Sequence, residues 1–142
     1  MVVRVVAAVV LFAALAALAW WLERRRRNDA PTQAASALPT QLDRADFPRP
    51  HAPWLVVLFT SSNCDSCAGL YDKAITLESG EVAVAEVEYF AQPELHDRYK
   101  VDAAPLTLIA DAEGVVVGSF LGSFSAPELW TAVAELRATP DV

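Results

Sequence analysis

The sequence predicts an α/β domain with a mixed sheet, in the order β-α-β-α-β-α-β-β-α, preceded by one transmembrane helix. Three observations support this prediction. Short apolar runs rich in β-branched residues alternate with helical patterns, two such runs near the C-terminus are joined by a four-residue turn, and a long run without charge lies near the N-terminus. Residues 38–142 are enough for one domain with its own hydrophobic core.

The N-terminal segment is predicted to be an uncleaved membrane anchor. Residues 5–22 carry no charge and are rich in Ala, Val and Leu. As a helix they would be roughly 27 Å long, close to the ~30 Å hydrocarbon core, and Trp20 and Trp21 would lie at the membrane–water boundary. The run is longer than the apolar region of a typical signal peptide. Residues 1–4 form a short tail before the anchor, and residues 23–37 form a basic flank and a polar, flexible linker after it.

The basic residues around this segment predict which side of the membrane the domain faces. Arg24, Arg25, Arg26 and Arg27 follow the apolar run directly, whereas Arg4 alone precedes it. The positive-inside bias therefore favours a single-pass protein of the cell membrane with a cytoplasmic domain, and the arginines can also contact anionic lipid headgroups. An outward-facing domain stays open as the alternative.

The charge of the domain excludes one class of partner. From residue 38 onward there are 6 basic and 16 acidic residues, a net charge of −10. A domain this acidic offers no basic surface to nucleic-acid phosphates, so we expect no nucleic-acid binding.

The first part of the domain is predicted to hold two short elements and one central strand. Residues 40–42 have the pattern of a strand, and residues 43–47 that of a helical turn begun by Asp43. Prolines then prevent regular structure until residue 54. Residues 54–60, WLVVLFT, are a continuous apolar run with β-branched and aromatic residues, which is typical of a strand buried on both faces.

The later elements continue the alternation of helices and strands. A helix is predicted over residues 65–78, ended by Ser79-Gly80. The others are a strand at 82–89, a helix at 93–99 that begins with proline, strands at 106–110 and 115–121 joined by the turn 111–114, and a closing helix at 126–137 capped by Ser125 and Glu128. The first three strands alternate with helices, so we expect parallel neighbours among them, whereas the last hairpin must be antiparallel.

The pair Cys64 and Cys67 carries the chemistry that the sequence suggests. Two residues separate the cysteines, and the pair lies where the buried strand passes into the helix. Free backbone N–H groups and the positive helix end would stabilise a thiolate at Cys64, and the thiolate is the attacking species in disulfide exchange. Cys67, one turn further on, would resolve the mixed disulfide. Two cysteines are too few for a disulfide-stapled secreted scaffold.

Other uses of the two cysteines stay open at this stage. Tetrahedral zinc needs two more ligands, and only His51 and His96 are present as further soft donors, in distant segments. The thiols could instead handle a soft ion such as copper or zinc, or the domain could be a non-catalytic interaction module. We expect no organic cofactor and no resident metal.

Three longer stretches resemble the thioredoxin family. LVVLFTSSNCDSCAGL is similar to the family's strand, active-site turn and helix. QPELHDRYKVDAAPLTLI resembles its helix, loop and proline-initiated strand, and EGVVVGSFLGSFSAPEL resembles its final hairpin and last helix. The resemblance covers roughly residues 38–137, nearly all of the part that follows the linker. The resemblance implies a thioredoxin-like fold and a monomeric protein thiol–disulfide oxidoreductase, with protein thiols or disulfides as substrates and a second redox protein as its electron partner.

The resemblance also implies roles for individual residues. Cys64 matches the attacking cysteine and Cys67 the resolving one. Pro105 matches the cis-proline that faces the cysteines, and its loop with Ala104 would offer backbone hydrogen bonds to an extended substrate segment. Gly122 matches a glycine near the substrate groove. Without the family, Pro105 would be an ordinary proline at a strand start and Gly122 a hairpin-end glycine.

The motif itself departs from the family pattern. Asn63 stands where the family has Trp, which alters the recognition surface. Asp65 and Ser66 replace Gly-Pro between the cysteines, and the charge of Asp65 opposes formation of the thiolate. Asp65 is equally explained as a favourable residue for the first turn of a helix.

A second departure concerns proton transfer. Leu58 stands where the family has a buried Asp, and Glu86 where it has the Lys partner of that Asp. Glu86 is therefore a candidate proton acceptor for Cys67 if its side chain points inward, and a solvated surface residue otherwise. The redox potential, the direction of electron flow and the reductase partner do not follow from the resemblance.

Overall fold

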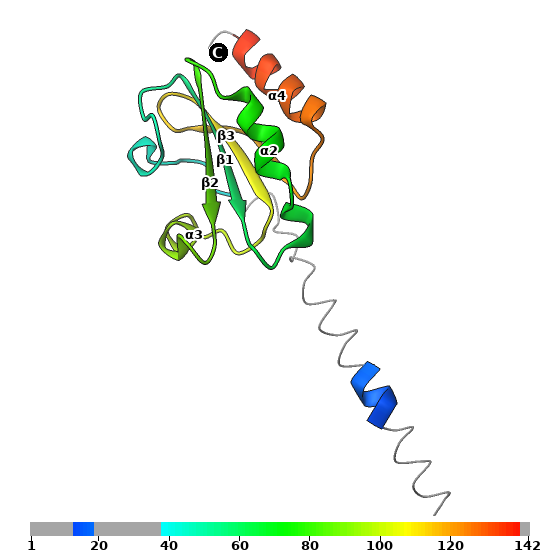
Figure 1. Cartoon of the computed structure of the whole chain (residues 1–142). Helices are drawn as coiled ribbons and strands as arrows, with labels where there is room; N and C mark the ends of the chain where they lie inside the picture. The colour runs from blue at the N-terminus through cyan, green and yellow to red at the C-terminus, as the bar shows by residue number, and fades with distance from the viewer. Residues whose placement is uncertain (1–12, 19–37, 140–142) are drawn as a thin grey trace, which may run out of the picture. The chain divides into compact units, whose positions relative to one another are not determined.

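The computed structural model describes residues 13–18 and 38–139, which belong to two separate units of the chain, Met1–Ala30 and Pro31–Val142 (Figure 1). Residues 13–18 are helical, and Leu15 and Leu18 are exposed. Within the two described ranges, no helix is both long enough and apolar enough to span a bilayer. Most of the predicted anchor at 5–22 lies outside the described residues, as do the tail at 1–4 and the flank and linker at 23–37.

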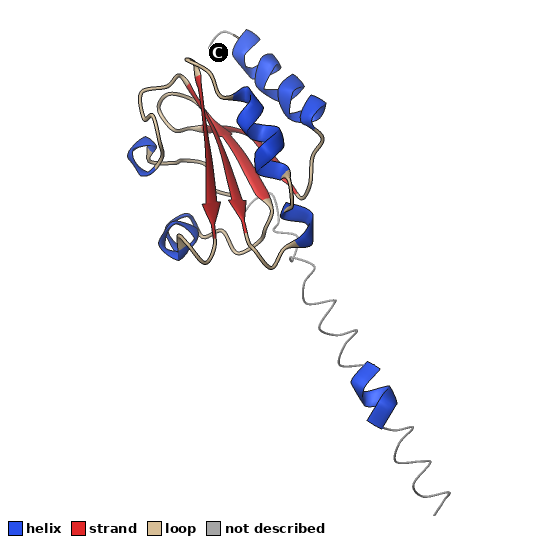
Figure 2. Ribbon diagram, viewed as in Figure 1, coloured by secondary structure: helices blue, strands red, loops and turns tan. Residues whose placement is uncertain are grey.

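The second unit is built on a mixed four-stranded sheet with the order β2-β1-β3-β4 (Figure 2). The strands are β1 (Trp54–Thr60), β2 (Val82–Glu88), β3 (Leu106–Ala110) and β4 (Val116–Leu121). β1 is parallel to β2 and antiparallel to β3, and β3 is antiparallel to β4. The parallel pair and the antiparallel hairpin are as the sequence predicted.

Helices cover the sheet on both faces. α2 (Leu70–Ala74) and α4 (Ala126–Ala138) lie on one face, and α3 (Pro93–Tyr99) covers the other (Figure 1). Alternate residues of β1 face the two sides, so Val56 and Leu58 pack toward α2 and α4, whereas the odd-numbered apolar residues pack toward α3. The prediction of a strand buried on both faces is confirmed, because residues 55–59 of β1 are all fully buried.

The strand predicted at 40–42 is wrong. It is reduced to a single antiparallel bridge between Gln41 and Val115, flanked by hydrogen bonds of Leu42 N to Gly114 O (2.8 Å) and of Val116 N to Thr40 O (2.9 Å). The chain turns away immediately into the 3₁₀ turn η2 (Arg44–Asp46), which Asp43 caps by accepting from Ala45 N, so no ladder can extend. The order of elements therefore begins with a turn.

The continuous helix predicted at 65–78 is also wrong. The segment consists of the 3₁₀ turn η3 (Asp65–Cys67), the short helix α2 and the 3₁₀ turn η4 (Ile75–Leu77). Ala68 (φ −57°, ψ 127°) and Gly69 (φ 70°, ψ 5°) have the dihedral angles of a type II turn, which needs a positive φ at its third residue. Glycine adopts this conformation without a steric penalty, so α2 begins after both cysteines.

The closing helix has the predicted cap. Ser125 Oγ accepts a hydrogen bond from Glu128 N (3.4 Å), and Glu128 Oε2 accepts one from Ser125 N (2.7 Å). The bond from the backbone N–H of Ser125 lowers the pKa of Glu128. This reciprocal pair explains why the sequence signal located the start of α4 correctly.

The turn at Gly69 predicts the effect of one substitution. Gly69→Ala should lower the free energy of unfolding of the full-length chain by about 1–2 kcal/mol, because alanine is strained at positive φ. No atom lies within 4 Å of the added Cβ, so the cost is conformational alone. Gly80→Ala is the control: its Cβ also meets nothing within 4 Å, and its φ is not in the left-handed range. Equal stability of the two variants in chemical denaturation would contradict the turn.

Candidate active site

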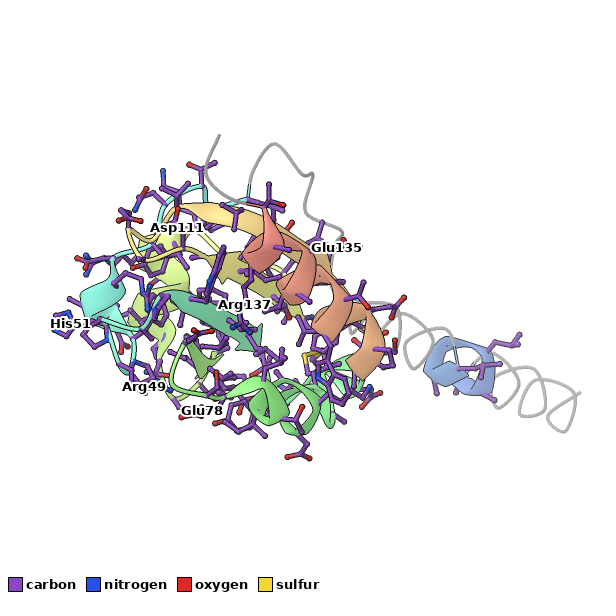
Figure 3. The ribbon with its side chains drawn as sticks, turned by 90° about the horizontal axis from the view of Figure 1, so that it is seen from above. Arg49, His51, Glu78, Asp111, Glu135 and Arg137 are labelled. Carbon is purple, nitrogen blue, oxygen red and sulfur yellow. A yellow bond between two sulfur atoms is a disulfide. The ribbon has the colours of Figure 1, made fainter. Side chains whose placement is uncertain are left out.

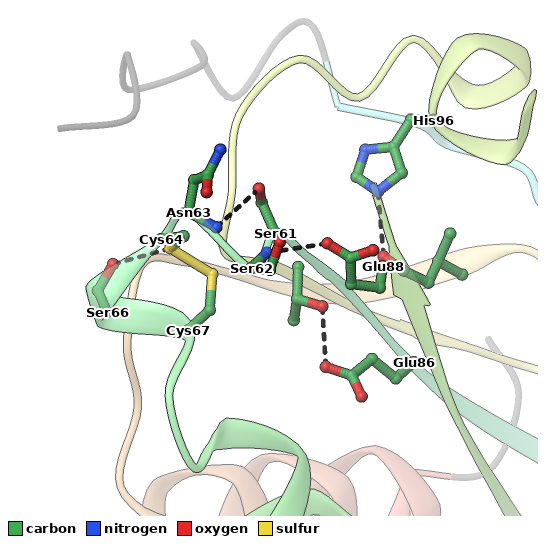
Figure 4. Close-up of a disulfide and its surroundings, with 11 residues drawn as sticks. Ser61, Ser62, Asn63, Cys64, Ser66, Cys67, Glu86, Glu88 and His96 are labelled. Atoms are coloured by element: carbon green, nitrogen blue, oxygen red, sulfur yellow. Dashed lines mark hydrogen bonds between the residues drawn. A yellow bond between two sulfur atoms is a disulfide. The ribbon is translucent and has the colours of Figure 1, made fainter. Parts of the chain in front are cut away.

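Cys64 and Cys67 form a disulfide in the segment that follows β1, beyond the turn at residues 61–63 (Figure 4). Their Cα atoms are 5.4 Å apart, within the range that a disulfide allows. Cys64 is the N-cap residue of η3 and is half-buried, whereas Cys67 lies within η3 and is 9% exposed. Cys64 is therefore the more accessible sulfur, as an attacking cysteine must be, and Cys67 is the more protected one.

A compact turn presents the disulfide. Cys64 N donates to Ser61 O (3.0 Å), Cys67 N donates to Cys64 O (3.1 Å), and Asn63 N donates to Ser61 Oγ (3.4 Å). The N-terminus of a long helix, which the sequence predicted as the source of thiolate stabilisation at Cys64, is absent here, because η3 has three residues. Local donors must take its place.

Ser66 supplies one such donor. Its Oγ lies 3.3 Å from Cys64 Sγ, so the hydroxyl can donate to the sulfur (Figure 4). Asp65 is exposed in the first turn of η3, and its side chain makes no hydrogen bond within the described part of the chain. The sequence placed Ser66 in the motif, but its contact with the sulfur depends on the short 3₁₀ turn, which sequence reasoning missed.

A cavity of about 340 Å³ lies beside the disulfide. It is lined by both cysteines, by the end of β1 and by Tyr71 of α2. Three carboxylates also line it, from Asp72, Glu86 and Glu88. The surroundings of the two sulfurs are thus polar and negatively charged on one side.

The sequence left open whether Glu86 is a solvated surface residue or a carboxylate near Cys67, and the structure shows features of both. Its side chain is exposed, yet it lines the cavity with the two cysteines and accepts a hydrogen bond from Thr60 Oγ1 (2.8 Å). Its partner in the sheet register is Leu58, which is fully buried and cannot accept a proton. A carboxylate therefore reaches this cavity from β2 and not from β1.

Glu88 is a site residue that the sequence analysis did not select. Its Oε1 accepts from Ser62 N (2.8 Å) (Figure 4). Its Oε2 accepts from Phe90 N and Ala91 N (both 2.9 Å). The hydrogen bond from Ser62 N is the largest cause of a lowered pKa at Glu88, followed among the hydrogen bonds by those from Ala91 and Phe90. The sequence signal that could have identified Glu88 was its position at the end of a strand, close to a polar turn.

Pro105 and Gly122 form a second group at the same end of the sheet. The Ala104–Pro105 peptide bond is cis, as the family resemblance implied, and Pro105 O accepts from Gly122 N (2.9 Å). Pro105 directly precedes Leu106, which is paired with Phe59 near the end of β1. The antiparallel register thus brings this loop to the end of β1. The segment that contains both cysteines (residues 61–68, the cysteine turn) starts at the same end. Neither residue lines the cavity described above.

The histidines do not join the cysteines. His51 is exposed and lies before the start of β1, at the opposite end of the unit from the disulfide (Figure 3). His96 is buried, and its two ring nitrogens face Val87 O (3.0 Å) and Val101 O (3.2 Å). Across residues 13–18 and 38–139, no group of three or more His, Cys, Asp or Glu is arranged to hold a metal ion.

Comparisons with known proteins support the fold. No protein-family model matches the sequence, and no curated protein matches it significantly. Among solved structures, the germline-specific thioredoxin Deadhead of Drosophila melanogaster matches with a TM-score of 0.52 and 22% identity, over 61% of this chain and 84% of its own. Thioredoxin from Fasciola hepatica matches with a TM-score of 0.51 and 25% identity, over 61% and 83% of the two chains. Chloroplastic thioredoxin z matches with a TM-score of 0.54 and 18% identity, over 61% and 80%. The chain therefore has the thioredoxin-like fold.

Proposed function

We propose that this protein is a thiol–disulfide oxidoreductase that acts on protein thiols and disulfides through Cys64 and Cys67. The observation that carries the proposal is the disulfide itself, which lies at the end of the central strand of a thioredoxin-like fold with its first sulfur accessible and its second protected. The cis-proline loop at the same end of the sheet supports it.

In the reducing direction the exchange has two steps. The Cys64 thiolate attacks a substrate disulfide, which forms a mixed disulfide and releases one substrate sulfur as a thiolate that then takes up a proton. Cys67 loses its proton and attacks Cys64 Sγ, which forms the Cys64–Cys67 disulfide and releases the second substrate sulfur. Two electrons and two protons pass to the substrate, and a dithiol partner must return them. Oxidation of a substrate dithiol is the reverse.

The surrounding residues have separate roles in this scheme. The Ser66 hydroxyl donates to Cys64 Sγ and stabilises the attacking thiolate. Glu86 accepts the proton of Cys67, because its carboxylate lines the same cavity as that cysteine. The backbone of Ala104 and Pro105, with Gly122 beside it, binds an extended substrate segment, and the exposed Asn63 contributes to the recognition surface.

We also propose that residues 5–22 attach the protein to the cell membrane, with the domain in the cytoplasm. The protein acts as a monomer in this proposal. The support is the uncharged run of membrane-spanning length and the four arginines, Arg24 to Arg27, that follow it. In this position the domain would meet reducing partners and would act as a reductant.

The redox assignment predicts a reversible two-electron transition. The full-length chain, titrated against defined ratios of reduced and oxidised glutathione, should interconvert between dithiol and disulfide with a single midpoint. Cys67→Ser should accumulate a stable mixed disulfide with glutathione, because the resolving thiol is absent, whereas Cys64→Ser should not. If the wild-type thiols never pair, or instead bind added zinc or copper tightly, the oxidoreductase assignment is wrong.

The role of Glu86 predicts a pH-dependent defect. Glu86→Gln should slow resolution of the mixed disulfide about tenfold at neutral pH, because the amide is not a base. The difference should disappear above roughly pH 9, where a cysteine thiol ionises without help. Rapid-quench measurement of the resolution rate across this range is the test. Glu135→Gln, an exposed carboxylate of α4, is the control, and equal rates in both variants would exclude Glu86 as the acceptor.

The orientation predicts the labelling of Cys64 in intact cells. Cells that express the full chain are treated with membrane-permeant dithiothreitol, washed, and exposed to a membrane-impermeant maleimide. A cytoplasmic domain should be labelled only after lysis. Labelling of intact cells would place the domain outside, and recovery of the chain in the soluble fraction would remove the anchor from the proposal.

A further inference from the structure

Glu88 links two loops that are far apart in the sequence. It is the last residue of β2, and its carboxylate accepts one hydrogen bond from the turn before Cys64 and two from the loop after β2. The bond from Ser62 spans 26 positions of the chain, whereas those from Phe90 and Ala91 are local. One side chain therefore connects the cysteine turn to a neighbouring element.

The bond from Ser62 attaches that turn to the end of β2. Residues 61–68 make several hydrogen bonds among themselves, such as Cys64 N to Ser61 O and Ala68 N to Asp65 O. Ser62 joins this segment to the end of β2, because its backbone N–H donates to Glu88, and a hydrogen bond from its side chain also contributes to the lowered pKa of Glu88. Packing of the buried Cys67 and the covalent connections to β1 and α2 also hold this segment.

The loop on the other side of Glu88 is itself well anchored. Tyr89 N donates to Thr60 O (2.9 Å), and the Tyr89 ring packs edge-on against the ring of His96 with 5.1 Å between centroids. His96 is 3% exposed and packs edge-on against the fully buried Phe59. The carboxylate of Glu88 thus connects the surface turn that contains Ser62 to a loop that is anchored in the core. Surface turns are in general more mobile than the elements that they connect.

The chemistry of the three donors selects a carboxylate of this length. An ionised carboxylate is an acceptor at both oxygens, and the three N–H groups keep the pKa of Glu88 below its ordinary value. A glutamine would present an NH₂ group to one set of N–H donors. An aspartate can still accept from the amides two and three positions ahead, as in an Asx turn, but it is one methylene too short to reach Ser62 as well.

We propose that Glu88 is a positioning residue of the redox site: it holds the turn at residues 61–63 so that Cys64 and Cys67 stay close in the dithiol state. The inference rests on the proposed function. Closure of a disulfide depends on how often its two sulfurs meet, so a turn that gains freedom in the reduced state favours the dithiol. Loss of the link from Glu88 to Ser62 should therefore make the disulfide easier to reduce.

Two variants separate position from charge. Glu88→Asp keeps the negative charge and the local hydrogen bonds of the loop but loses the bond from Ser62. Asp72→Asn removes a carboxylate charge from the same cavity, and Asp72 has no hydrogen bond to the turn among the described residues. The full-length proteins are titrated with glutathione at roughly pH 5 and left to reach equilibrium. This pH is well below the ordinary pKa of a cysteine thiol, about 8.5, so a neighbouring charge has less thiolate to act on.

In Glu88→Asp the equilibrium constant for disulfide formation should fall by about three- to tenfold, which is roughly 15–30 mV at 29.6 mV per tenfold. Asp72→Asn should keep the wild-type midpoint at this pH. Amide hydrogen exchange gives a direct second readout. Exchange at Ser62 should become faster in Glu88→Asp, while the amides of Phe90 and Ala91 keep their protection.

Each other outcome overturns a different statement. A wild-type midpoint in Glu88→Asp, or an unchanged exchange rate at Ser62, removes the positioning role of Glu88 and leaves the proposed function intact. The same shift in Asp72→Asn as in Glu88→Asp would assign the effect to charge and not to position. A wild-type protein that shows no dithiol–disulfide transition removes the proposed function itself.

Discussion

The burial of β1 on both faces is the constraint on which the rest of the structure depends. Its side chains alternate between two cores, and its backbone groups are paired on one edge with β2 and on the other with β3. Each fully buried aliphatic or aromatic side chain contributes about 1.5–3 kcal/mol. A strand held in this way cannot shift its register, so the position at which it ends, Thr60, determines where the cysteine turn begins. The same register brings the loop that contains Pro105 to that end of the sheet.

The negative charge around the two sulfurs is unfavourable for a thiolate. Carboxylates of Asp72, Glu86 and Glu88 line the cavity beside the sulfurs, and negative charge opposes formation of a thiolate. No long helix begins at Cys64 to offset it, since α2 starts at Leu70. What the structure offers is short-range: the Ser66 hydroxyl at the sulfur and a carboxylate, Glu88, whose charge is already engaged by three backbone N–H groups. The sulfur of Cys64 therefore does not lie at the N-terminus of a long helix, and the buried residue of β1 paired with Glu86 is Leu58, which is not an acid.

Cations are placed away from this cavity. Arg49 pairs with Glu78 (3.7 Å), Arg98 pairs with Asp43 (3.2 Å) and Asp46 (3.0 Å), and Arg137 pairs with Glu81. Arg49, Glu78 and Arg137 are visible in Figure 3. Largely exposed pairs, such as Arg49–Glu78, contribute little stability, about 0–1 kcal/mol. Their consequence is for the site, because no Lys or Arg of the described residues lines the cavity beside the sulfurs.

The sequence by itself determined the elements whose signals are local. The apolar run of β1, the proline at the start of α3 and the capping box of α4 are each contained within a few residues, and each was located correctly. The spacing of Cys64 and Cys67 likewise predicted a disulfide-forming pair. Gly69 was also a local signal, but the helix predicted over residues 65–78 continued through it, so the turn that separates the cysteines from α2 was not predicted.

Only the tertiary structure decided which distant groups meet at the sulfurs. Glu86 reaches the cavity from β2, and Glu88 contacts a turn 26 positions away, because β2 lies parallel to β1 in one register. An alternating pattern of apolar and polar residues is compatible with every strand register that differs by two positions. The alternation therefore could not show which carboxylate would be opposite the cysteine turn, and the family resemblance indicated Glu86 but not Glu88.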